Sequence, residues 1–229
     1  MVVPLRDIQP RQSFPIVTIG LLIVNVLFFL YELSLGERLQ GFLQQAAFVP
    51  ERYFAEGGVA AEARPILVSM FLHGGWMHLI GNMLYLWIFG DNVEDQLGHL
   101  RFLVFYLACG WLATMAHAYM NTGSAVPSIG ASGAIAGVLG AYLLMFPRAR
   151  VLTLLPLGFY MRVAELPALV VLGFWFVLQL FNGVAALGVR SAQTTGVAVW
   201  AHVGGFMVGM ILCLILRGRR RPRAWSARR

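Results

Sequence analysis

Six apolar segments follow one another along this chain, and each is close to the length of a membrane crossing. They cover residues 14–33, 76–90, 102–120, 130–147, 166–187 and 196–216. A helix needs about 20 apolar residues to cross a bilayer. No segment alternates apolar and polar residues with the period of a strand, which disfavours a membrane β-barrel. The segments therefore predict an all-α membrane protein, a bundle of six transmembrane helices.

Composition supports a membrane protein over a large soluble domain. Hydrophobic residues make up 59% of the chain and charged residues 12%, against about 45–50% and about 25% in soluble domains. We expect a short N-terminal segment over residues 1–13, a membrane domain over 14–217 and a basic tail over 218–229. The two cysteines, Cys109 and Cys213, lie inside apolar segments without metal-ligand spacing, which favours packing residues. We predict no metal and no cofactor.

The arginines predict how the bundle is oriented. All 17 basic residues are arginine, and 13 of them fall in the N-terminal segment, the second and fourth loops and the C-terminal tail. The positive-inside rule therefore places both termini in the cytoplasm and the loop over 34–75 outside. The compact six-helix form, with no targeting extension, predicts the inner (plasma) membrane of a bacterium. The arginine-rich tail favours anionic lipid head groups as partners over nucleic acid.

Ser132 lies at the start of the fourth apolar segment, between Gly130 and Gly133. Two interpretations are open. Gly133, Gly137 and Gly140 form a small-residue face that allows another helix to approach closely, which makes Ser132 a packing residue. Gly130 and Gly133, however, leave the serine backbone uncrowded, so its N–H and Oγ can both meet a substrate carbonyl, as at a nucleophile.

His202 lies near the start of the sixth segment, followed by Gly205 and Gly209. Those glycines again form a small-residue face, which favours packing. An ionisable residue inside a membrane segment, however, is a candidate for function. By the predicted topology, Ser132 and His202 lie at a similar shallow depth below the same membrane surface.

A third group of polar residues precedes and opens the second segment. His78 and Asn82 are four residues apart and so share one face of a helix, while His73 lies beyond a Gly-Gly break in the incoming loop. A zinc protease helix requires His-Glu-x-x-His, which is absent here. An imidazole and an amide directed at one point instead suit the stabilisation of an oxyanion.

Taken together, these motifs resemble the rhomboid family of intramembrane serine proteases, of the bacterial type with six transmembrane helices. The matching positions occur in the family's order: His73, His78 and Asn82; Gly90, Glu94 and Gly98; Gly130, Ser132, Gly133 and Gly137; Ala201, His202, Gly205 and Gly209. The resemblance covers roughly residues 12–217. It implies Ser132 as nucleophile, His202 as general base, and His78, Asn82 and Gly130 around the oxyanion. The implied supporting residues are His73, Gly133, Gly137, Gly205 and Gly209.

Two departures from the family pattern stand out. The Trp-Arg pair that members often carry in the first outer loop is Ala63-Arg64 here. An aromatic ring that some members stack on the catalytic histidine, four residues after the nucleophile, is replaced by Ala136. The sequence therefore does not predict what orients His202. Phe174, Trp175 and Phe176 in the fifth segment are expected to face lipid.

The resemblance implies acyl transfer by a Ser-His dyad on membrane-protein substrates, cleaved in or near their transmembrane segments. No acid lies in the centre of an apolar segment, so a third acidic member is not expected. An alternative is a rhomboid-fold protein that binds membrane clients without cutting them. A small transporter is a further alternative, although the chain has neither an internal repeat nor the intramembrane acids typical of one. The natural substrate and the oligomeric state are not predicted.

Overall fold

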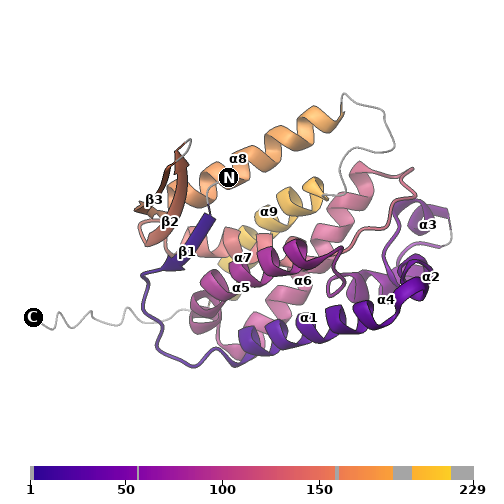
Figure 1. Cartoon of the computed structure of the whole chain (residues 1–229), viewed down its shortest axis with the longest axis horizontal. Helices are drawn as coiled ribbons and strands as arrows, with labels where there is room; N and C mark the ends of the chain where they lie inside the picture. The colour runs from indigo at the N-terminus through magenta and orange to yellow at the C-terminus, as the bar shows by residue number, and fades with distance from the viewer. Residues whose placement is uncertain (1–2, 56, 158–159, 188–197, 218–229) are drawn as a thin grey trace, which may run out of the picture.

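The computed structural model describes residues 3–55, 57–157, 160–187 and 198–217 and shows a bundle of helices (Figure 1). Each of the six apolar segments forms one long helix. These are α1 (Ile16–Ser34), α5 (Trp76–Leu97), α6 (His99–Met120), α7 (Ser132–Met145), α8 (Ala168–Leu187) and α9 (Val199–Leu216). The predicted helical membrane bundle is confirmed. The predicted tail over 218–229 lies outside the described residues.

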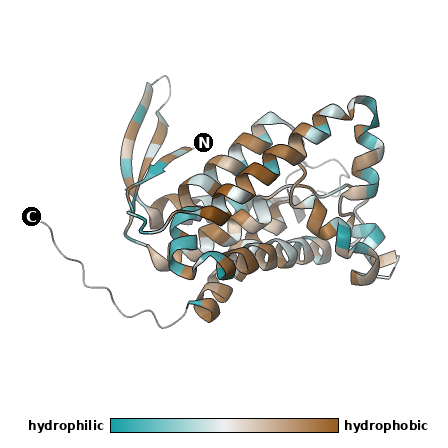
Figure 2. Cartoon of the chain, turned by 90° about the horizontal axis from the view of Figure 1, so that it is seen from below, coloured by the Kyte–Doolittle hydropathy of each residue, from teal (hydrophilic) through white to brown (hydrophobic). Residues whose placement is uncertain are grey.

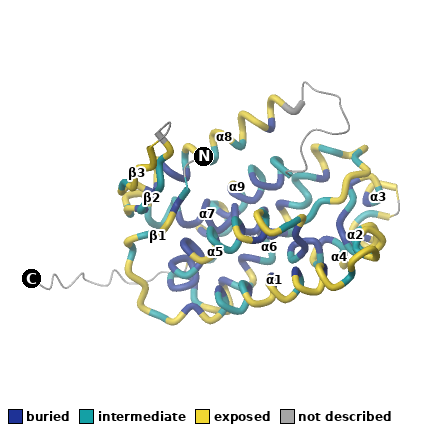
Figure 3. Tube along the Cα trace, viewed as in Figure 1, coloured by how far each residue is buried: buried dark blue, intermediate teal, exposed yellow. Residues whose placement is uncertain are grey.

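Four of the described helices are long and apolar enough to cross a membrane: α1, α6, α8 up to Ala185, and α9. Helix α5 is equally long, but its last two turns carry Asp91, Glu94 and Asp95. Helix α7 has 14 residues and spans only roughly 21 Å. It lies in the centre of the bundle (Figure 3), where its neighbours bury every residue from Gly133 to Tyr142. Hydrophobic residues make up much of the helices (Figure 2), and many large ones are exposed, as on α1 and α8.

Glycines set how closely α7 and α9 approach. A Cβ atom at Gly205 would collide with the carbonyl oxygen of Gly133, and one at Gly209 with that of Gly137. The small-residue faces predicted for the two segments therefore pack on each other, backbone against backbone. This contact fixes α9 beside the N-terminal half of α7.

Glu94 ties α1 to the end of α5. Its buried carboxylate accepts hydrogen bonds from the backbone N–H of Val17 at 2.9 Å and of Thr18 at 2.7 Å, and from the Thr18 hydroxyl. These N–H groups belong to the first turn of α1 and have no partner within the helix. The glutamate of the Gly90-Glu94-Gly98 motif thus caps a neighbouring helix. Its position in α5 alone does not predict this role.

The long loop between α1 and α5 contains short helices that the sequence did not predict. They are the 3₁₀ helix Gly36–Arg38 and helices α2 (Leu39–Ala46), α3 (Pro50–Ala55) and α4 (Val59–Ser69). An ion pair between Arg52 and the buried Glu62 joins α3 to α4. Arg52 also donates to the Ala47 carbonyl oxygen at the end of α2. One arginine therefore holds the three short helices together.

A small antiparallel sheet was also not predicted. It consists of β1 (Val3–Asp7), β2 (Arg150–Leu157) and β3 (Tyr160–Pro167), in the order β1-β2-β3. The N-terminal segment pairs with a hairpin that connects α7 to α8, far away in the sequence. Pro167, assigned to the fifth apolar segment, instead ends β3.

Candidate active site

Ser132 and His202 lie within hydrogen-bond distance of each other. The Oγ atom of Ser132 is 2.7 Å from Nε2 of His202, although 70 residues separate them in the sequence. Ser132 is the first residue of α7, and His202 lies in the first turn of α9. The close contact of α7 with α9 through their glycines brings the two side chains together at the same end of the bundle.

The other ring nitrogen of His202 contacts Gln179 on α8. The Nδ1 atom lies 2.9 Å from Oε1 of this glutamine. An amide oxygen is only an acceptor, so this contact places the imidazole proton on Nδ1 and leaves the Nε2 lone pair directed at Ser132. Gln179 could not be singled out from the sequence, because it is one of two polar residues, with Asn182, in an apolar helix.

Trp175 supplies an aromatic ring beside His202. The ring centroids are 5.8 Å apart, with an angle of 38° between the planes. Phe176 stacks on Phe206 of α9 at 4.5 Å. The prediction that all three aromatics of this cluster face lipid is therefore wrong for Trp175 and Phe176, which α8 directs at α9. Phe174 is 52% exposed, as predicted.

Gly130 and His78 form the opposite wall of the site. Gly130 has φ +126°, a conformation that favours glycine, and a Cβ atom there would lie 2.8 Å from Nε2 of His78. The Gly130 N–H donates to the Ser69 carbonyl oxygen at 2.8 Å. The Gly74 N–H donates to Nδ1 of His78 at 3.3 Å, so the neutral ring carries its proton on Nε2, the atom nearest the Gly130 turn.

Asn82 is buried one turn below His78 on α5, and its Nδ2 atom has no hydrogen-bond partner among the described residues. A buried donor without a partner is rare and calls for an explanation. His73 lies in the loop before α5, with its ring 5.2 Å from that of His78. Burial and the neighbouring His78 lower the pKa of His73 to about 4. His73 is therefore neutral near pH 7 and packs behind His78.

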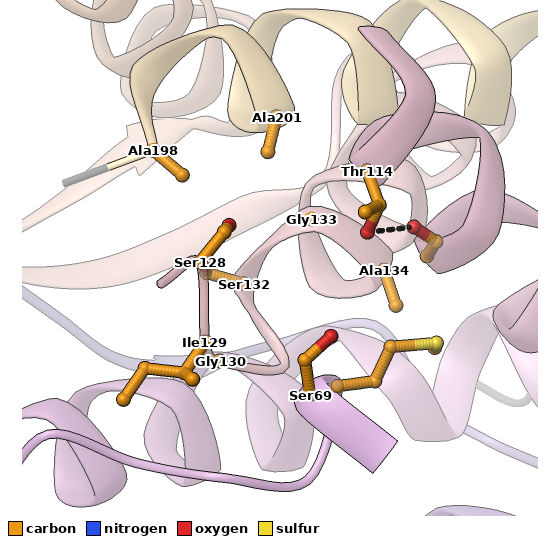
Figure 4. Close-up of a pocket in the computed structure, with 12 residues that line it drawn as sticks. Ser69, Thr114, Ser128, Ile129, Gly130, Ser132, Gly133, Ala134, Ala198 and Ala201 are labelled. Atoms are coloured by element: carbon orange, nitrogen blue, oxygen red, sulfur yellow. Dashed lines mark hydrogen bonds between the residues drawn. The ribbon is translucent and has the colours of Figure 1, made fainter. Parts of the chain in front are cut away.

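A small cavity borders Ser132 (Figure 4). Polar groups of Ser69, Thr114 and Ser128 line it together with the backbone of Gly130, while Ala198, just before α9, and Ala201 of α9 form its far side. It has room for about one water molecule. The loop before α7, the end of α4 and the start of α9 thus meet around the serine.

The comparisons with known proteins agree with this architecture. The family model of the rhomboid domain matches residues 60–219. "Presenilin-associated rhomboid-like protein A, mitochondrial" of Danio rerio is 35% identical over 130 residues, which cover 54% of this chain and 34% of the relative. "Rhomboid protein 1, mitochondrial" of Saccharomyces cerevisiae is 32% identical over 157 residues, 64% of this chain and 40% of the relative.

"RHOMBOID-like protein 6, mitochondrial" of Arabidopsis thaliana is 32% identical over 151 residues, 66% of this chain and 43% of the relative. This chain spans less than half the length of each of these three relatives. The predicted location, a bacterial plasma membrane with both termini in the cytoplasm, is wrong on this comparison, because all three relatives are mitochondrial proteins. The predicted bacterial type likewise finds no support in them. With the matched model covering most of its length, the chain belongs to the rhomboid family.

Proposed function

We propose that this protein is an intramembrane serine endopeptidase that uses Ser132 and His202 as a catalytic dyad. The observation that carries the proposal is the 2.7 Å approach of His202 Nε2 to Ser132 Oγ. A serine hydroxyl is a weak nucleophile until a neighbouring base accepts its proton. Two residues from different helices, joined in this geometry in a membrane bundle, have the arrangement that acyl transfer requires.

In the first step His202 accepts the hydroxyl proton while Oγ attacks the scissile carbonyl carbon. The resulting imidazolium carries protons on both nitrogens, and Gln179 Oε1 accepts the one on Nδ1. The C–N bond then breaks, and Nε2 donates its proton to the leaving amine. Water attacks the acyl-enzyme with His202 again as base, which releases the carboxylate product and restores Ser132.

The negative charge on the tetrahedral intermediate would be met by three donors. The Ser132 N–H is at the N-terminus of α7, where backbone N–H groups lack partners within the helix and the helix dipole favours negative charge. His78 offers Nε2–H, and Asn82 offers its unpaired Nδ2–H. Each donor of this kind is typically worth roughly 2.7–4 kcal/mol of barrier.

The substrates that fit such a site are membrane proteins, because the dyad lies between helices of a membrane bundle. A peptide bond can reach Ser132 only as an extended strand, since a helix keeps its carbonyl groups bonded. We therefore propose cleavage in or near a transmembrane segment where the substrate helix is easily unwound. The relatives' names support a mitochondrial membrane as the location. The predicted contact of the arginine-rich tail with anionic lipid head groups remains a prediction.

Covalent labelling with a fluorophosphonate tests the nucleophile. The full chain in detergent should bind one label, Ser132→Ala should bind none, and His202→Ala should label much more slowly. Ser128→Ala is the matched control, because Ser128 borders the same cavity, whereas among the described residues His202 is hydrogen-bonded to Ser132. Labelling that persists in Ser132→Ala, or is lost in Ser128→Ala, would contradict the assignment.

Cleavage of a single-pass model substrate in proteoliposomes tests the activity itself. We expect the wild-type chain to cut within or next to the transmembrane segment, as located by mass spectrometry of the fragments. Ser132→Ala and His202→Ala should each abolish cutting, while Ser128→Ala should retain it. A wild-type chain that captures the substrate without cutting it would instead indicate a protein that only binds membrane clients.

A further inference from the structure

A second cavity lies away from Ser132, between α1 and the short helices of the α1–α5 loop. It is a groove of about 420 Å³, within the range of roughly 300–1,000 Å³ in which proteins bind small lipophilic molecules. Its lining is apolar except for a phenol and a guanidinium. The lining residues are Leu27, Phe28, Tyr31, Phe42, Ala46, Arg64 and Val68.

The groove lies at the membrane boundary. Tyr31 is in the last turn of α1, a helix long and apolar enough to cross a membrane, and tyrosine there marks the head-group level. Its ring meets that of Phe42 edge to face, with centroids 5.5 Å apart. Helix α2 directs Phe42 and Ala46 at the groove and exposes Gln44 and Gln45, the pattern of a helix that lies in the interface.

Arg64 is the charged group at this groove. It is exposed on α4, and none of the ion pairs between described residues includes it. The nearest acid on its own helix, Glu62, is buried and already paired with Arg52. An exposed guanidinium beside an apolar groove matches an amphiphile that has an apolar tail and an anionic head.

We propose that this groove binds one anionic phospholipid, with an acyl chain along Phe28 and Val68 and the phosphate on Arg64. The groove is apolar where the acyl chain would lie and cationic where the phosphate would lie. It opens at the depth at which the acyl chains of phospholipids meet their head groups. The inference does not depend on the proposed protease activity. It assigns a role to the arginine of the Ala63-Arg64 pair.

Helix α4 connects this groove to the loop before Ser132. Arg64 and Val68 line the groove, and the next residue, Ser69, ends α4 and accepts the N–H of Gly130. A lipid seated against Val68 would therefore stabilise the end of α4 that positions the Gly130 turn.

Native mass spectrometry of retained lipid tests the proposal. The full chain is reconstituted in nanodiscs that contain equal amounts of phosphatidylglycerol and phosphatidylcholine, and it is then released into mild detergent. We expect one retained phospholipid, mostly phosphatidylglycerol. Arg64→Gln should lower phosphatidylglycerol retention about tenfold, the loss of one hydrogen-bonded charge contact. Ala46→Trp, which fills the groove, should abolish retention of both lipids.

Two controls separate the groove from general effects. Arg38→Gln removes an exposed arginine of the same loop that does not line the groove, and Leu67→Trp adds an indole to an exposed position of α4 outside it. Both should retain lipid as the wild type does, and circular dichroism checks that all variants are folded. The proposal is overturned if the wild type retains no lipid, if it retains both lipids equally, or if Arg64→Gln or Ala46→Trp behaves like its control.

Discussion

Gln179 Oε1 lies 2.9 Å from Nδ1 of His202, on the side of the imidazole opposite Ser132. A neutral amide thus occupies the position that an acid has in a catalytic triad. It can fix the ring tautomer, but it brings no charge that would have to be buried within the bundle.

We expect Gln179→Ala to lower kcat about 10- to 100-fold with little change in KM, the size of effect seen when the hydrogen-bond partner of a metal-binding histidine is removed. Steady-state cleavage of a model substrate measures both constants. Asn182→Ala, an exposed polar position on the same helix, should leave them unchanged. An unaltered kcat in Gln179→Ala would show that packing alone orients His202.

Trp175 provides the ring beside His202 that Ala136 does not. Trp175→Leu should lower kcat roughly 2- to 10-fold, because an aromatic contact contributes about 0.5–1.5 kcal/mol. Trp175→Phe should keep most of the wild-type kcat, which would show that the aromatic ring matters and not only the volume of the side chain. Phe174→Leu changes an exposed neighbour and serves as the control; an equal loss there would indicate a general effect on α8.

Asn82 should contribute to turnover and not to stability. Its Nδ2 atom has no partner among the described residues, so Asn82→Leu removes no hydrogen bond of that donor from the resting protein. We expect kcat to fall about 10²- to 10³-fold, as for an oxyanion donor, with an unchanged thermal unfolding temperature. A variant that unfolds early at normal kcat would assign Asn82 to the core instead.

The α7–α9 contact should tolerate no side chain at Gly205. A methyl group there collides with the Gly133 carbonyl oxygen, so Gly205→Ala should lower the free energy of unfolding by about 1–3 kcal/mol. It should also lower activity, since the same contact sets the distance from Ser132 to His202. In Gly173→Ala the added Cβ meets nothing within 4 Å, and a gain of about 0.4–1 kcal/mol is expected. Denaturant unfolding in detergent compares the two.

Asp7 makes stability depend on pH. Burial, opposed by the Tyr142 hydrogen bond and reinforced by Asp91, raises the pKa of Asp7 to about 6. A raised carboxyl pKa means that the folded protein binds more protons than the unfolded chain between about pH 4 and 6. Stability should therefore decrease as pH rises through that window, by at most about 1.4 kcal/mol per pH unit.

Thermal unfolding of the wild type and of Asp7→Asn from pH 4 to 7 measures this effect. The asparagine keeps an acceptor for the Tyr142 hydroxyl, which lies 2.8 Å from Asp7 Oδ2, but it does not titrate. Between pH 4 and 6 the unfolding temperature of the wild type should decrease relative to that of Asp7→Asn. Parallel profiles would contradict the raised pKa.

The class of fold could be predicted from the apolar segments, and the candidate pair from motifs that resemble those of the rhomboid family. Segment length and apolar content predict the six helices, because the thickness of the bilayer requires a similar length of apolar helix for every crossing. The small-residue faces predict close helix contacts, and the resemblance of the glycine, histidine and Ser132 motifs to the rhomboid family predicts which helices meet. These signals are local and periodic, so they can be read without the structure.

The surroundings of that pair could not be predicted, because they depend on how the helices pack. Gln179 and Trp175 are one polar and one aromatic residue of an apolar helix, and their contact with His202 depends on how α8 is rotated against α9. The sheet of β1 with β2 and β3 joins segments more than 140 residues apart, and the groove at Arg64 requires α1, α2 and α4 at once. Rotation and long-range pairing arise from packing over the whole chain, which no local pattern encodes.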